Sequence, residues 1–231
     1  MNISKKYGRT YHYPFSPGTT SDDRVAHEYW RDVSKHKMVI HTEKLDGENN
    51  CLSRDGVFAR SHASPTTSPW TSAIRERWQS IKYDLGDLEF FGENLYAVHS
   101  IEYRKLESHY FVFAVRINET WLSWDEVLFY AAMFDFPTVP VLRTINPADK
   151  SSFEHDMMDL VQEPSVFDSY DAITGFPCQR EGIVSRNADE YTVGDFEHNV
   201  FKYVRKNHVK TNEHWTRTWR RAKLSWEIKA S

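Results

Sequence analysis

The sequence is poor in cysteine and lacks the long apolar runs that membrane proteins need. Only Cys51 and Cys178 occur among its 231 residues, far apart and without a nearby group of histidines. This spacing implies no disulfide framework and suggests no zinc site. The first fifteen residues carry no apolar stretch of the kind found in secretory signals, and no run approaches the length that spans a bilayer. We therefore expect a protein of the reducing cytoplasm that does not contact a membrane.

The sequence also has no overall positive charge, which argues weakly against binding to nucleic acid. The formal net charge is −4, but it is unevenly distributed. Residues 200–231 contain nine lysines and arginines against two glutamates, with Trp215, Trp219 and Trp226 between them. Such a segment could hold a phosphate backbone, or it could be a solvated helix that docks on an acidic body. Both alternatives stay open from the sequence.

Strand patterns outnumber helix patterns along the chain, and they do not alternate as in parallel sheets. The ranges that we expect to form strands are 38–44, 51–61 as a hairpin around Asp55-Gly56, 88–98, 110–117, 181–186 and 199–204. The ranges that we expect to form helices are 23–34 with a cap at Asp22 or Asp23, 68–81, 123–134 with a capping box, 151–163, and a basic C-terminal segment of about 207–231. This order predicts an α+β fold, with antiparallel sheets and peripheral helices in a single domain over residues 1–231.

Four short segments place a charged residue beside an apolar run, and each lies in or at the end of an expected strand. They read TEKLDGEN from Thr42, FFGEN from Phe90, EGIV from Glu181 and VFKYV from Val200. Strand ends hold charged groups rigidly, so that cations can meet phosphate oxygens and carboxylates can meet a metal. The pattern therefore indicates a site that handles phosphate.

These segments, in this order, resemble the motifs of covalent nucleotidyltransferases. The Lys44-Leu45-Asp46-Gly47 stretch resembles the K-x-D-G motif of ligases and capping enzymes, and the longer TEKLDGEN resembles the phage-type nick-sealing and RNA-editing RNA ligases. FFGEN, the aromatic strand YFVF, EGIV and VFKYV resemble the motifs that follow in that family. The resemblance covers about residues 38–206 and implies an ATP-dependent RNA ligase.

The resemblance implies a role for each motif residue. Lys44 would be the nucleophile that takes up AMP, and an amine attacks phosphorus only when deprotonated, so we expect nearby cations to lower its pKa. Glu93 would accept a hydrogen bond from a ribose hydroxyl, and Phe113 would stack on adenine. Glu181 would bind Mg²⁺ or Mn²⁺, and Lys202 would neutralise charge on the α-phosphate.

Other residues of the nucleotide site follow from the same resemblance. Glu43 and Leu45 flank the nucleophile, and the backbone of Glu43 would face the adenine. Asn49 would help to align the RNA phosphate, and Arg60 matches a basic position that follows the nucleophile in RNA ligases. Taken without the resemblance, each of these could be an ordinary core or surface residue, and we interpret Asp46 as a turn former.

One position departs from the family pattern. Many members carry a second lysine two residues after the lysine of the fifth motif, where this sequence has Val204. Arg205 follows, but strand alternation should turn it away from Lys202. The sequence leaves open which cation completes the phosphate site.

The expected function is therefore ATP-dependent joining of 5′-phosphate and 3′-hydroxyl RNA ends through a lysyl-AMP intermediate, with ATP, a divalent cation and RNA as ligands. A partner protein could supply further RNA binding. DNA ligases and capping enzymes are alternatives, but they follow the fifth motif with an OB-fold domain, and the 25 residues after Lys206 are too few for one. A non-catalytic module that binds nucleic-acid ends is a third alternative.

Overall fold

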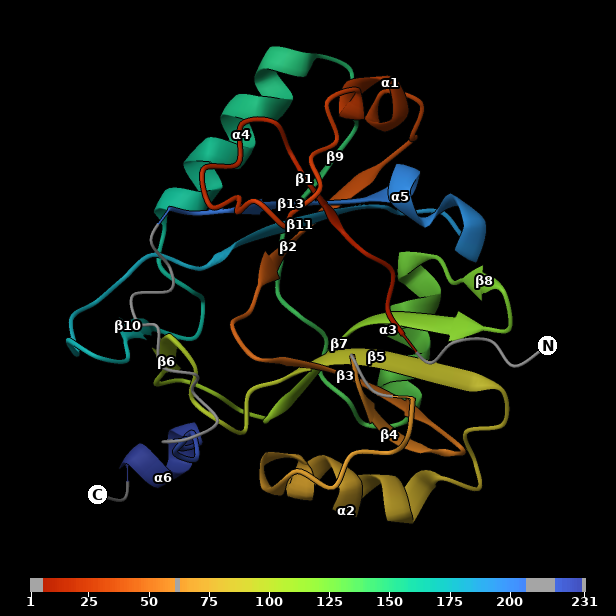
Figure 1. Cartoon of the computed structure of the whole chain (residues 1–231), viewed down its shortest axis with the longest axis vertical. Coiled ribbons are helices and arrows are strands. Elements are labelled where there is room, and N and C mark those ends of the chain that lie inside the picture. Colours follow the sequence, from red (N-terminus) through yellow and green to blue (C-terminus); the bar gives the residue numbers. More distant parts are fainter. Residues whose placement is uncertain (1–5, 61–62, 207–218, 230–231) are drawn as a thin grey trace.

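The computed structural model describes residues 6–60, 63–206 and 219–229, with the backbone only at residue 229. Within these residues the chain forms two large sheets, one above the other in Figure 1, with helices on their outer sides. The α+β class, with largely antiparallel sheets and peripheral helices, is as the sequence predicts. No helix in these ranges combines the length and the apolarity needed to cross a membrane.

The first sheet has the strand order β1-β13-β11-β2-β9. Its strands are β1 (Tyr11–His12), β2 (Val39–Lys44), β9 (Val141–Ile145), β11 (Gly182–Asn187) and β13 (Val200–Val204). All neighbours are antiparallel except β1, which pairs in parallel with β13. This sheet therefore carries three of the four motif segments: the end of β2, the start of β11 and the middle of β13.

The second sheet has the strand order β12-β8-β7-β5-β3-β4 and is antiparallel throughout. Its strands are β3 (Glu48–Ser53), β4 (Gly56–Ala59), β5 (Leu88–Asn94), β7 (Tyr110–Ile117), β8 (Thr120–Trp121) and β12 (Tyr191–Thr192). The hairpin expected around Asp55-Gly56 is the β3–β4 pair. A small two-stranded sheet, β6 (Ile101–Tyr103) with β10 (Ser169–Asp171), lies beside these layers.

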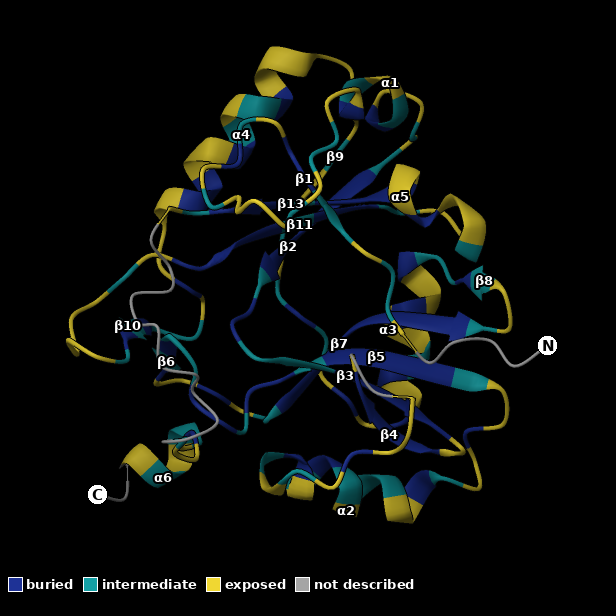
Figure 2. Ribbon diagram, in the orientation of Figure 1, coloured by how far each residue is buried: buried dark blue, intermediate teal, exposed yellow. Residues whose placement is uncertain are grey.

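Helices pack on the two large sheets. They are α1 (Tyr29–Val33) and α4 (Lys150–Gln162) on the first sheet, and α2 (Ser72–Ile81), after a 3₁₀ turn over Pro69–Thr71, and α3 (Trp124–Met133) on the second. The short α5 (Phe196–Asn199), after a 3₁₀ turn over Val193–Asp195, leads into β13, and α6 (Ser225–Lys229) lies near β6 (Figure 1). The predicted capping box starts α3, with Ser123 and Glu126 bonded to each other's backbone N–H. The exposed residues of α2 and α4 face outward in Figure 2.

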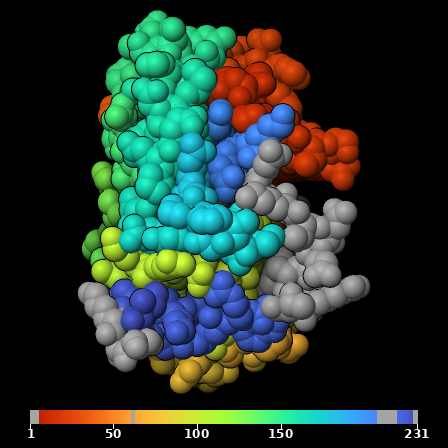
Figure 3. Space-filling view, turned by 90° about the vertical axis from the view of Figure 1, so that its left-hand side faces the viewer, coloured from red at the N-terminus to blue at the C-terminus, as the bar shows by residue number. Residues whose placement is uncertain are grey.

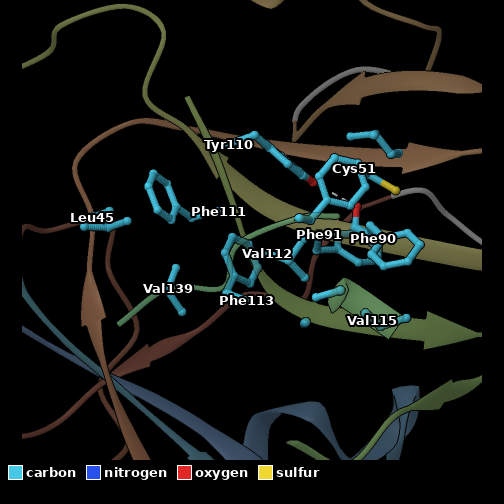
Figure 4. Close-up of a cluster of buried hydrophobic side chains, with 14 of the residues drawn as sticks. Leu45, Cys51, Phe90, Phe91, Tyr110, Phe111, Val112, Phe113, Val115 and Val139 are labelled. Atoms are coloured by element: carbon cyan, nitrogen blue, oxygen red, sulfur yellow. Dashed lines mark hydrogen bonds between the residues drawn. The ribbon is translucent and has the colours of Figure 1, made fainter. Parts of the chain in front are cut away.

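Two apolar clusters hold the layers together. The larger cluster consists mainly of side chains from the second sheet, α2 and α3. Rings in it such as Phe90, Phe91 and Phe111 are almost fully buried (Figure 4). The smaller one lies between the first sheet and α1 and α4, around Phe153 and Phe201. Burial of each such ring stabilises the fold by about 1.5–3 kcal/mol. With both clusters in place, the strand ends that carry the motifs are held rigidly.

Two sequence predictions about helices are wrong. The helix expected over 23–34 is only Tyr29–Val33, because Asp23 does not cap it. The carboxylate of Asp23 instead accepts hydrogen bonds from the N–H and hydroxyl of Thr20, and the backbone at Arg24 and Ala26 bonds to His12. These contacts hold residues 23–26 beside β1 as extended chain.

The basic C-terminal segment is also not helical over residues 219–224, while residues 207–218 of that prediction lie outside the described residues. The N–H of Val98 donates to the carbonyl oxygen of Arg220, and the N–H of Ala222 donates to that of Tyr96, so Arg221 forms an isolated antiparallel bridge with Ala97. Ala222 is buried in the larger cluster. The C-terminal residues, in blue, lie against the residues around β6 in Figure 3, and only Ser225–Lys229 forms a helix.

Candidate active site

A cavity of about 760 Å³ lies where the motif-bearing strands of the two sheets meet. Of the residues that the sequence analysis singled out, its lining contains Glu43, Lys44, Leu45, Asn49, Arg60, Glu93, Phe113 and Lys202. Glu181 joins them through its contact with Lys44. The fold thus brings every predicted site residue to one place, although they come from segments more than 150 residues apart in the sequence.

Lys44 is the last residue of β2, and its side chain is paired with a carboxylate. Its Nζ lies 2.8 Å from Glu181 Oε2, and Glu181 is 3% exposed. Burial by itself would lower the pKa of Lys44, but the carboxylates of Glu181, Glu93 and Asp46 outweigh it, and the pKa is raised. The expectation that neighbouring cations lower this pKa is therefore wrong for the protein's own residues, since the strongest charged neighbours of the amine are anions.

The turn after Lys44 is fixed by hydrogen bonds to the second sheet and its neighbours. Asp46 Oδ2 accepts the N–H groups of Ser100 (2.8 Å) and Ile101 (2.9 Å), so Asp46 has the structural role that we expected. A Cβ on Gly47 would lie 2.5 Å from the carbonyl oxygen of Asn94, a distance that no side chain tolerates. Only glycine therefore lets the chain turn this closely beside β5.

Glu93 comes from β5 on the opposite side of the cavity. Its Oε1 accepts the N–H of Gly47 at 3.1 Å, which links the two sheets beside the nucleophile. Burial raises the pKa of Glu93 to about 8, although the positive charge of Lys44 opposes this. Burial thus disfavours the charged form of this carboxyl group, and the ammonium group of Lys44 favours it.

The apolar part of the cavity lies between the sheets. Phe113 on β7 lines it together with Val139 and Val184, and Phe113 and Val139 are both seen in the cluster of Figure 4. A flat aromatic ring and a branched aliphatic side chain form a wall on which a base can stack. The apolar wall formed by these three side chains suits a purine base better than a charged group.

Glu43 precedes the nucleophile and is 1% exposed. Its carboxylate accepts the N–H of Val166 at 3.3 Å, and burial raises its pKa. Its own backbone N–H donates to the carbonyl oxygen of Pro140 at 2.9 Å, so this group is already bonded. Glu43 thus fastens β2 to two neighbouring segments while it lines the cavity.

Lys202 projects from β13 into the same cavity. Its Nζ lies 3.4 Å from Asp23 Oδ1, and burial lowers its pKa while Asp23 opposes that shift. Val204 is buried, and Arg205 donates from Nε to the carbonyl oxygen of Arg180, outside the cavity lining. Arg205 therefore does not replace the second lysine of the family pattern, as strand alternation predicts.

A family model of RNA ligases matches residues 37–204. The chain belongs to the RNA ligase family. No curated protein sequence matches it.

Solved structures of an RNA ligase from Naegleria gruberi share the fold of this family member. A mutant of that ligase with ATP and Mn aligns with a TM-score of 0.55 at 18% identity, over 89% of this chain and 62% of that one. The same ligase with pyrophosphate aligns with a TM-score of 0.54 at 15% identity, over 89% and 60%. A mutant of the same ligase with AMP and Mn aligns with a TM-score of 0.53 at 16% identity, over 88% of this chain and 61% of that one. This chain thus spans about three fifths of the length of the ligase chains that it matches.

Several residues that line this cavity were not assigned a role from the sequence. They are Tyr7, Thr10, Glu48, His99, Val139, Val184 and Arg186. Arg186 lies two residues after Val184 on β11, so strand alternation could have placed it on the same face. It is 6% exposed, bonds to the carbonyl oxygen of Phe113 and to the hydroxyl of Thr42 (3.1 Å), and adds a cation to the cavity. No local pattern points to Tyr7 or Thr10, which reach the cavity only through the tertiary fold.

The donor set of this cavity fits a cation that is held mainly by phosphate and water. Within the described ranges no group of three or more histidine, cysteine, aspartate or glutamate side chains is arranged as a protein cage for a metal. The carboxyl groups of Glu181 and Glu93 lie close to Lys44, where the phosphate oxygens of a bound nucleotide would come. Mg²⁺ and Mn²⁺ accept such oxygen ligands, and Mg²⁺ usually keeps several waters.

Proposed function

We propose that this protein is an ATP-dependent RNA ligase that joins 5′-phosphate and 3′-hydroxyl RNA ends through a covalent lysyl-AMP on Lys44. One observation supports this most strongly: Lys44, its partner Glu181, and Glu93, Phe113 and Lys202 meet at one cavity. An amine nucleophile, an aromatic wall, carboxylates and a second cation are what adenylyl transfer requires.

In the first step, the Nζ of Lys44 attacks the α-phosphorus of ATP. A phosphorus–nitrogen bond forms, the bond to the pyrophosphate oxygen breaks, and pyrophosphate leaves with its electron pair. Phe113 and Val184 would hold the base, Glu93 would bond to the ribose, and the ammonium group of Lys202 would stabilise charge on the α-phosphate. The carboxylate of Glu181 lies at 2.8 Å and can accept the proton that the Lys44 amine must lose. A bound Mg²⁺ or Mn²⁺, held by Glu181, would supply further positive charge.

The later steps use the RNA. The 5′-phosphate attacks the lysyl-AMP, so that AMP moves to the RNA end and the lysine is released. The 3′-hydroxyl then attacks that end, the phosphodiester bond forms, and AMP leaves. Asn49 and the exposed Arg60 lie on the β3–β4 side of the cavity, and we assign them to alignment of the RNA phosphate. Glu43 and Leu45 would shape the nucleotide site from the β2 side.

We further infer that residues 1–231 act as one nucleotidyltransferase domain. The basic C-terminal residues, or a partner protein, would supply additional contact to RNA. A cytoplasmic location remains a prediction from the low cysteine content.

The proposal is tested by incubating the purified chain with ATP labelled at the α-phosphate and Mg²⁺ or Mn²⁺, then measuring label that stays on the denatured protein. We expect labelling by wild type, none by Lys44→Ala, and unchanged labelling by Lys37→Ala, an exposed lysine near β2. Joining of nicked and single-stranded RNA substrates follows as the second assay.

Each outcome decides between the alternatives. Wild type that takes up no label from ATP would end the ligase proposal and favour a module that only binds nucleic-acid ends. Label from GTP alone would favour a capping enzyme, and sealing of DNA but not RNA would favour a DNA ligase. Labelling of Lys44→Ala would show that another residue is the nucleophile.

A further inference from the structure

Lys202 shares its carboxylate partner with a buried histidine. Asp23 Oδ1 lies 3.4 Å from Lys202 Nζ and 3.2 Å from His12 Nε2. The other oxygen, Oδ2, accepts the N–H (3.0 Å) and the hydroxyl (2.9 Å) of Thr20. Both oxygens of Asp23 are therefore engaged, and its carboxylate has little freedom to leave the lysine.

The histidine in this group is itself fixed to the strand that carries Lys202. Parallel pairing of β1 with β13 places His12 opposite Lys202, and His12 is 1% exposed. His12 Nδ1 lies 2.9 Å from Ser16 Oγ, which accepts the N–H of Val204 at 3.0 Å. The N-terminal segment thus binds β13 at Lys202 and at Val204 through polar contacts, which are strong in a low-dielectric environment.

Contact among Ser16, His12 and Asp23 does not create a nucleophile of the serine-hydrolase kind. Ser16 is 4% exposed, and its Oγ already accepts a backbone hydrogen bond. A substrate carbonyl cannot approach such an oxygen. These three residues therefore serve to hold a position, and the group that they hold at the cavity is the ammonium of Lys202.

The charge of the cavity makes this support necessary. Lys202, Lys44, Arg60 and Arg186 all line the cavity, so Lys202 is repelled by other cations. A lysine side chain has four rotatable bonds and strong hydration, and without a fixed anion it would turn towards solvent. Asp23 is the acidic side chain that lies within ion-pair distance of Lys202 in the described part of the chain.

We propose that Asp23 is a positioning residue for adenylyl transfer: it holds the Lys202 ammonium group where the α-phosphate of ATP develops negative charge. Asp23 then supports the catalytic machinery from the N-terminal part of the chain, although the match to the family model begins only at residue 37. This inference rests on the proposed ligase function, and it assigns to that site a residue that the sequence motifs do not include.

The first test is the rate of covalent AMP labelling by the full chain carrying Asp23→Asn, at saturating ATP. This variant keeps the shape of the side chain and removes its charge. We expect labelling to slow by about tenfold or more, the size typical of a lost charge-assisted contact near a transition state. The matched control is Asp22→Asn, an exposed neighbouring aspartate, which should label like wild type with a similar thermal midpoint.

A double-mutant cycle separates positioning from general support of the fold. In the Lys202→Ala background, Asp23→Asn should slow labelling no further, because the residue it acts through is gone. A reduction of the same size in both backgrounds would overturn the proposal, as would Asp23→Asn labelling at the wild-type rate.

ATP affinity provides a readout that does not depend on chemistry. Calorimetry measures the affinity for ATP in proteins that cannot take up AMP. In the Lys44→Ala background, Asp23→Asn should weaken ATP binding several-fold. In the Lys44→Ala/Lys202→Ala background, the same substitution should leave ATP binding unchanged. Equal losses in the two backgrounds would again overturn the proposal. Wild type that takes up no AMP would instead refute the ligase function itself.

Discussion

Gly182 lies opposite Lys44 in the antiparallel register of β11 with β2, and this places Glu181, the residue before it, beside the lysine amine. The same glycine lies opposite Val204 on its other side, against the backbone of Tyr203. The Lys44–Glu181 pair is thus set by strand register, and the close packing of three strands around one glycine fixes that register.

Gly182→Ala should therefore damage both stability and activity. The new Cβ would overlap the backbone carbonyl group of Tyr203, which cannot rotate away as a side chain can. We expect a loss of about 1–3 kcal/mol in the free energy of unfolding, typical of overpacking, together with slower AMP labelling. Urea unfolding and the labelling assay measure the two effects. Gly194→Ala is the control, since the added Cβ would find only Thr192 Oγ1 at 3.6 Å, and equal losses in both variants would contradict the register argument.

Glu181→Gln should lower the pKa of Lys44 and yet reduce activity. The carboxylate of Glu181 is the strongest of the influences that raise this pKa, so a neutral amide at that position lets burial pull it down. The pKa can be measured by NMR on ¹³C-labelled lysine. AMP labelling at neutral pH should fall by about a hundredfold, because the variant loses a proton acceptor and a cation ligand. Glu190→Gln, an exposed glutamate just after β11, should change neither quantity; an unchanged Lys44 pKa in Glu181→Gln would contradict the prediction.

His41 should make the protein less stable in mild acid. It lies fully buried on β2 with Nδ1 2.8 Å from Ser185 Oγ, and burial lowers its pKa from 6.5 to about 4. Between these values the unfolded chain binds the proton and the folded chain does not, so the free energy of unfolding falls as pH drops through this range. One such proton gives a slope of up to about 1.4 kcal/mol per pH unit.

The contribution of His41 is measured by urea unfolding of wild type and His41→Gln between pH 7.5 and pH 4.5. The free energy of unfolding of the variant should fall less steeply with decreasing pH than that of wild type, by the equivalent of up to one bound proton. His12, whose pKa burial also lowers to about 4, contributes equally to the slope in both proteins. His155→Gln, with a side chain that is 74% exposed, should keep the wild-type slope. Identical slopes in wild type and His41→Gln would show that His41 is not buried neutral.

Arg116→Met should destabilise the fold strongly. Arg116 on β7 is paired with Glu89 on β5 at 2.5 Å and 2.6 Å, with both side chains almost inaccessible. Removal of one partner leaves a buried carboxylate without its counter-charge, which costs about 3–5 kcal/mol. Chemical unfolding measures the loss. Arg54→Met removes an exposed arginine that pairs with Asp55 and Asp87, and should cost under about 1 kcal/mol; a small loss for Arg116→Met would contradict the role given to this pair.

The sequence alone determined the local elements and the identity of the motif residues. Alternating apolar strands, the Ser123–Glu126 capping box and the Asp55-Gly56 turn depend on contacts between residues close together in the chain, so their patterns can be read without coordinates. The order of the charged strand ends likewise pointed to Lys44, Glu93, Glu181 and Lys202 before their positions were known.

Only the tertiary structure decided which charges meet and how the chain ends pack. The pairing of Asp23 with Lys202 joins residues 179 positions apart, and the extended course of residues 219–224 depends on backbone bonds to residues 96–98. The raised pKa of Lys44 arises because three carboxylates from separate segments surround it. These features follow from distances between strands that no local pattern encodes, because hydrogen bonding and charge act through space, whereas propensity and periodicity act along the chain.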